Sequence, residues 1–294
     1  MIRVLLQTTI QAVEDDWNID RYSLLRDYLA SLEDERGSPV FAVTARDLEP
    51  DARGHDPVLS ELADSDFDEI WLFAADAGDG LSRGDCAGIG AFRRRGGGIL
   101  ATRDHQDTGV SICNLAGVSA AHYFHSRNPD PDASRHCVDD TETRTISWPN
   151  YHSGRNGDYQ RVIAAEPVHE LLRHPNSPGE PIEYFPAHPH EGGIGAPEAN
   201  PHARVIARGR SKITGRPFNL IVAFEGDEEK AGEPIGRALI HSSFHHFVDY
   251  NWDTDKGCPS FVEEEPGDGM KQEPRALADI HDYVRNAAFW LAGK

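Results

Sequence analysis

Histidines lie beside carboxylates or polar side chains at three places in this 294-residue chain. The first is Arg103-Asp104-His105, which directly follows the apolar run ILAT at 99–102. An aspartate beside a histidine can fix the imidazole tautomer or share a cation with it. We therefore predict Asp104 and His105 as catalytic residues and Arg103 as a substrate-binding residue. The alternative is structural, with Asp104 capping a helix that follows.

The second place is the segment FPAHPHEGG at 185–193, in which Pro189 separates His188 from His190. Proline biases the preceding residue toward an extended backbone, so both imidazoles can lie on one side of the chain. With Glu191, these two histidines form a partial metal site, for which zinc is the best match among divalent ions. Exposed loop histidines are the alternative, because two histidines alone do not complete a zinc site.

The third place is HSSFHHFVDYNWD at 241–253, which begins at the end of an apolar run. His245 is predicted to lie at the end of a strand and to be the third catalytic residue. Three further residues are predicted to bind the substrate, two of them through aromatic rings that can stack on a sugar: His246, Tyr250 and Trp252. Packing in the core is the alternative for these aromatic rings.

Strand and helix patterns alternate along the elements that must position these residues. Apolar runs typical of strands lie at 2–8, 39–45, 69–75, 99–102, 218–224 and 237–244. Helical patterns lie at 19–33, 56–64, 81–95 and 274–292. Such alternation predicts an α/β fold with a mostly parallel sheet covered on both faces. Ligands of these sheets bind outside the carboxyl ends of the strands, where we expect the three groups to converge.

The middle of the chain, at about 120–215, is rich in Pro, Gly, Asn and His. We interpret it as an irregular insertion, with strand-like pieces at 143–148 and 203–209, that packs over the sheet edge of one domain spanning 1–294. The acidic segment EEEPGD at 263–268 is interpreted as a solvated loop.

Three stretches together resemble the ThuA-like (trehalose-utilisation) branch of the class I glutamine amidotransferase-like superfamily. They are DEIWLFAADAGDGLSRGDCAGIGAFRRRGGGILAT at 68–102, GRALIHSSFHH at 236–246 and HDYVRNAAFWLAGK at 281–294. The resemblance implies a flavodoxin-like three-layer sandwich and places His245 at the histidine that ends a late strand of the family. Members of this branch often lack the glutaminase nucleophile.

A glutaminase nucleophile requires a cysteine on a tight strand-to-helix turn. The string Gly84-Asp85-Cys86-Ala87-Gly88 has the spacing Gly-x-Cys-x-Gly, but it falls inside a predicted helix, so we do not predict Cys86 as a nucleophile. Cys113 is predicted to be a small buried apolar residue. The four cysteines are scattered without a Cys-x-x-Cys pair, which favours a reducing, cytoplasmic compartment.

Charge and hydropathy exclude several classes of partner. The chain has 29 Lys and Arg against 49 Asp and Glu, a net charge of −20, which argues against nucleic acid and against an anionic membrane surface. No apolar stretch approaches the length of a membrane span. Association of copies through an edge strand is left open.

These observations predict a His- and carboxylate-lined pocket that binds or hydrolyses a small polar, carbohydrate-like molecule, with assistance from a divalent metal as one option. The alternative is a non-catalytic binding or scaffold protein on the same fold, and an active glutaminase is a third reading.

Overall fold

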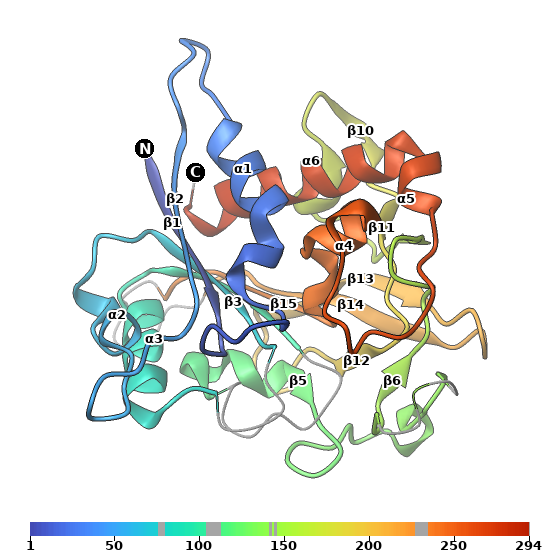
Figure 1. Cartoon of the computed structure of the whole chain (residues 1–294), viewed down its shortest axis with the longest axis horizontal. Coiled ribbons are helices and arrows are strands. Elements are labelled where there is room, and N and C mark those ends of the chain that lie inside the picture. The colour runs from blue at the N-terminus through green and yellow to red at the C-terminus, as the bar shows by residue number, and fades with distance from the viewer. Residues whose placement is uncertain (76–79, 104–112, 141–142, 144–145, 227–234, 294) are drawn as a thin grey trace.

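The computed structural model describes residues 1–75, 80–103, 113–140, 143, 146–226 and 235–293. An eight-stranded sheet forms its centre, in the order β2-β1-β3-β4-β15-β14-β13-β8 (Figure 1). In that order the strands are Phe41–Arg46, Ile2–Thr8, Glu69–Phe73, Gly98–Thr102, Ala238–His241, Pro217–Phe224, Ala203–Arg210 and Ile163–Ala164.

The first five strands in this order, from β2 to β15, run parallel to their neighbours. The remaining three, β14, β13 and β8, each pair antiparallel with the preceding strand. The mostly parallel sheet predicted from the alternating pattern is therefore confirmed. Its parallel strands are apolar on both sides because helices cover both faces.

Helices cover the two faces in separate groups. The helices are α1 (Ser23–Ser31), α2 (Pro57–Ser60), α3 (Arg83–Arg94), α4 (Asp249–Trp252), α5 (Gly269–Gln272) and α6 (Pro274–Leu291). Along β3, Trp71 and Phe73 pack in one core cluster with residues of α1 and α6, whereas Ile70 and Leu72 pack in the other with α2 and α3. This alternation produces three layers, and the flavodoxin-like sandwich is confirmed.

The pairing of α2 with α3 requires a glycine. A Cβ atom added to Gly88 of α3 would lie 2.1 Å from the backbone oxygen of Leu59 on α2. The helix begins with a capping box, in which Ser82 and Asp85 each accept a hydrogen bond from the other's backbone N–H. These local features fix α3 where the pattern at 81–95 predicted it.

The middle of the chain is more regular than its composition suggests. Three small sheets form there, from β5 (His122–Tyr123), β12 (Glu191–Ile194) and β6 (Asn150–Tyr151); from β7 (Tyr159–Arg161) and β11 (Tyr184–Pro186); and from β9 (Arg173–His174) and β10 (Ser177–Pro181). Both β8 and β13 extend the central sheet, so the insertion is partly continuous with it.

The predicted strand at 143–148 needs correction, because the described residues of this segment, 143 and 146–148, form no strand. Thr143 N–H instead donates to the side chain of Asp140 at 3.0 Å, and Ile146 N–H donates to the Thr143 carbonyl at 3.2 Å. Such local bonds satisfy the backbone within a turn and compete with strand pairing.

The sheet of β5, β12 and β6 lies against the carboxyl ends of central strands (Figure 1). Arg103, just after β4, donates from Nε to the Tyr123 carbonyl at 2.7 Å. Gly192 N–H donates to the carbonyl of Ser242, just after β15, at 2.9 Å. The insertion therefore covers the edge at which ligands of parallel sheets bind. None of the helices in the described residues has the length and apolar run that crossing a bilayer would require.

At the opposite edge, Glu69 begins β3 with its side chain fully buried. Its carboxyl accepts a hydrogen bond from Trp71 Nε1 at 3.0 Å, but desolvation raises its pKa well above the usual value. The native state therefore holds this proton more tightly than the unfolded state does. The free energy of unfolding must therefore decrease as the pH rises above the pKa that Glu69 has in the unfolded chain.

We predict that Glu69→Gln removes this fall. The free energy of unfolding of the variant, relative to the unmodified protein, should increase between pH 5 and pH 8 in urea denaturation. An equal difference at both pH values would contradict the assignment. Glu35→Gln, at an exposed site, is the control.

Candidate functional site

The carboxylate of Glu191, at the start of β12, is fully buried beneath the carboxyl edge of the sheet. Its Oε1 accepts from Ser153 Oγ at 3.0 Å and from Gln160 Nε2 at 2.5 Å, and lies 3.1 Å from His246 Nε2. Its Oε2 accepts from Ser242 Oγ at 2.7 Å. A buried carboxylate is tolerated only when donors compensate for the lost water, and here four donors do so.

A chain of side chains continues from Glu191 through two histidines. His246 Nδ1 lies 3.3 Å from His241 Nδ1, and His241 Nε2 lies 2.7 Å from the Tyr283 hydroxyl. Because the carboxylate can only accept, His246 carries a proton on Nε2. In the neutral tautomer of His246, His241 then donates from Nδ1 and accepts from Tyr283 at Nε2. Burial lowers the pKa of His241 well below its usual value, which agrees with a neutral ring.

A second pair of histidines, His188 and His245, stacks face to face. Their ring centroids lie 3.7 Å apart and their planes differ by 12°. His245 Nδ1 lies 3.3 Å from Asn251 Oδ1, and Asn251 uses its amide protons on other acceptors, including the Ala187 carbonyl at 2.8 Å. His245 is therefore the donor at Nδ1. His188 Nδ1 lies 3.1 Å from Ser243 Oγ.

A third group lies nearer the surface and joins His190 to two carboxylates. His190 Nδ1 is 3.0 Å from Asp140 Oδ2, and His190 Nε2 is 3.7 Å from Glu264 Oε1. One ligand atom from each residue lies within 4.8 Å of the other two. Glu264 also lines a cavity of about 400 Å³ together with Thr143, His152, Arg155, Glu263 and Glu265.

The structure brings the second and third predicted segments together, and Arg103, the described residue of the first, donates from its backbone N–H to the His241 carbonyl at 2.9 Å. His188 and His245 are in contact, from segments 185–193 and 241–253. Asp104 and His105, the other predicted catalytic residues, lie outside the described residues.

The chain turns where a continuing strand was expected. Strand β15 ends at His241, and a 3₁₀ helix at Phe244–His246 follows. This turn directs both His245 and His246 into the cluster, whereas strand register would place them on opposite faces.

The predicted substrate-binding residues are mostly buried by packing. Arg103 is 1% exposed, and its guanidinium lies 4.7 Å from the centroid of the Phe124 ring. Trp252 Nε1 donates to the His246 carbonyl at 2.8 Å and so helps to position that residue. Tyr250 is also buried, and burial raises the pKa of its phenol. For the two aromatic residues, the described contacts match the core alternative.

Only His190 of the three predicted metal ligands belongs to the group with metal-ligand spacing. His188 and Glu191 are engaged in the contacts given above. Sequence reasoning missed Asp140 and Glu264. The signal for Glu264 was present in the acidic run at 263–268, but its proximity to His190 depends on the fold, because more than seventy residues separate them.

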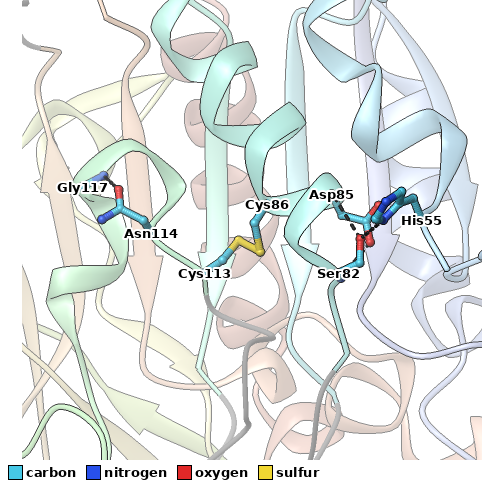
Figure 2. The surroundings of a disulfide bond; sticks show 7 residues. All are labelled: His55, Ser82, Asp85, Cys86, Cys113, Asn114 and Gly117. Carbon is cyan, nitrogen blue, oxygen red and sulfur yellow. Dashed lines mark hydrogen bonds between the residues drawn. A yellow bond between two sulfur atoms is a disulfide. The ribbon is translucent and has the colours of Figure 1, made fainter. Parts of the chain in front are cut away.

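The cysteine prediction needs correction at one position. Figure 2 shows Cys86 of α3 joined to Cys113 by a disulfide across 27 residues, so Cys113 is not the simple apolar residue expected. Cys86 lies within the helix, as predicted, and its sulfur is in a covalent bond. Burial raises the pKa of the Cys137 thiol to about 11, which opposes formation of a thiolate there.

Comparison with known proteins supports the fold. No family model matches the chain, and no match is found among curated proteins. The chain is similar in structure to a ThuA-like protein from Parabacteroides merdae, with 13% identity, a TM-score of 0.51 and coverage of 100% of this chain and 91% of that one. It also aligns with the glutaminase domain of Trypanosoma brucei CTPS, at 11% identity, a TM-score of 0.42 and coverage of 97% and 94%. The first likeness confirms the ThuA-like fold.

We predict that Glu191→Ala destabilises the protein by about 3–5 kcal/mol, because it leaves buried donors without their acceptor. Glu191→Gln keeps one carbonyl oxygen and should lose less. Urea denaturation measures both. Loss below about 1 kcal/mol for the alanine variant, the range typical of surface substitutions, would refute the role of the carboxylate as an anchor.

Proposed function

We propose that this protein is a metal-assisted hydrolase of a small polar substrate, with a divalent ion held by Asp140, His190 and Glu264. The observation that carries the proposal is the spacing of one imidazole nitrogen and two carboxylate oxygens within 4.8 Å. Three protein ligands of this kind fit a zinc site that keeps one position open for water or substrate. When bound, such an ion supplies Lewis acidity and an activated water.

The residues of the chain supply binding and proton transfer around that position. His245 donates from Nδ1 to Asn251, and in its neutral form it would accept a proton at Nε2, which suits a general base. Stacking on His188 fixes the plane of the His245 ring. Glu191 acts as a positioning residue, because it holds Ser242 and His246 on either side of His245 in the chain.

A non-catalytic binding protein is the second candidate. It is favoured by burial, since His188 and His245 are only 2% and 3% exposed. A glutaminase is the least supported reading, because Cys86 is in a disulfide and Cys137 is buried.

We predict that metal-stripped protein binds one Zn²⁺ per chain and that His190→Ala removes this binding. Isothermal titration with ZnCl₂ and elemental analysis after dialysis measure the stoichiometry. His202→Ala, at an exposed histidine outside the group, is the matched control and should retain the ion. Equal zinc content in both variants would refute the site.

We further predict that His245→Asn lowers kcat for zinc-dependent hydrolysis of p-nitrophenyl acetate by about 10²–10⁴-fold, the usual contribution of a general base. Zinc content should be unchanged, because His245 is not among the ligands. An unchanged rate would remove His245 from the mechanism. Zinc binding without hydrolysis by the unmodified protein would favour the binding-protein candidate.

A further inference from the structure

A second cavity, of about 930 Å³, is separate from the candidate metal site and is unused by the proposed function. His152 lines the cavity at the metal site, and the next residue in the chain, Ser153, lines this one. Its volume is within the range of small-molecule sites.

Three cationic residues line this cavity in a chain of net charge −20: Arg161, Arg210 and Lys212. Three acids line it as well, so the lining has no net formal charge. Each acid accepts a hydrogen bond from a nearby residue: Asp158 from Gly269 N–H, Asp268 from the Gln272 amide, and Glu273 from Arg275 N–H. Within the described part of the chain, Arg161 lies 3.5 Å from Glu183 and Arg210 donates to the Gly215 carbonyl at 2.6 Å. Each guanidinium has five donors, so both can still bind an anion.

The position of Lys212 depends on a glycine. Gly154 has a φ of +150°, and a Cβ atom there would lie 2.8 Å from Lys212 Nζ and 2.8 Å from the Ala187 side chain. The backbone of Lys212 is fixed as well, since its N–H donates to the His152 carbonyl at 2.8 Å. The absent side chain at 154 therefore gives the ammonium group room beside Ser153.

The remaining wall suits a hydroxylated ring. Tyr159 of β7 and Tyr184 of β11 meet edge to face at 4.8 Å between centroids and supply apolar ring surfaces. Ser153 and Gln160 also line the cavity, and both donate to Glu191. Only the side chains of Ser153 and Gln160 would therefore separate a ligand in this cavity from the buried carboxylate of Glu191.

We propose that this cavity binds an anionic sugar, a ring molecule that combines hydroxyl groups with a carboxylate, as in a uronic acid. Lys212 and the two arginines bind the carboxylate, and the tyrosines pack against the ring. The inference rests on the cavity alone and does not require the metal site.

Isothermal titration of the full chain with D-glucuronate, D-galacturonate, D-glucose and inorganic phosphate tests the proposal. We expect at least one uronate to bind, with at least 10-fold weaker affinity in Lys212→Met and unchanged affinity in Lys256→Met, an exposed lysine outside the cavity. Gly154→Ala should weaken binding in the same direction, and added NaCl should weaken it because the contact is ionic.

Any other result of these titrations contradicts a specific part of the proposal. Binding of neither uronate refutes the proposal. Phosphate binding in the absence of uronate binding refutes the sugar class, and equal binding of glucose and a uronate refutes the role of the cations. An unchanged affinity in Lys212→Met refutes the assigned position. Zinc binding measured on the same variants keeps this result separate from that of the metal site.

Discussion

The burial of one negative charge, on Glu191, governs the arrangement of the polar cluster. A carboxylate without water needs several donors at short distance, and local sequence cannot provide them. Here they come from Ser153, Gln160, Ser242 and His246, which belong to separate segments of the insertion and the sheet edge. The cluster is thus satisfied only when the insertion is docked on the central sheet.

This constraint also organises the histidines. The hydrogen-bonded chain that ends on Glu191 holds His241 and His246 in fixed positions, so they serve as support. The stacked pair of His188 and His245 lies on segments adjacent to that support, and His190 lies nearer the surface with its two carboxylates. Chemistry at the surface therefore depends on a rigid polar interior behind it.

Much of the fold follows from the sequence because apolar runs and helical stripes depend on near neighbours. The strands at 2–8 and 69–75 and the helix at 274–292 are of this kind. The failures have long-range causes. Thr143 N–H donates to Asp140 where a strand was expected, the turn after His241 redirects His246, and Glu264 becomes a candidate ligand only through folding. Residue type pointed to histidine chemistry, but the partners of each histidine required the tertiary structure.

The disulfide has a topological consequence for the sheet. Strand β4, from Gly98 to Thr102, lies between Cys86 and Cys113 in the chain, so a central strand is enclosed in a covalent ring that also contains most of α3. Closing a ring of this size lowers the entropy of the unfolded chain. In the simplest polymer treatment, this raises the free energy of unfolding by about 3–4 kcal/mol. The redox state of one bond therefore alters how far the middle of the sheet can separate from its covering helix when the molecule opens.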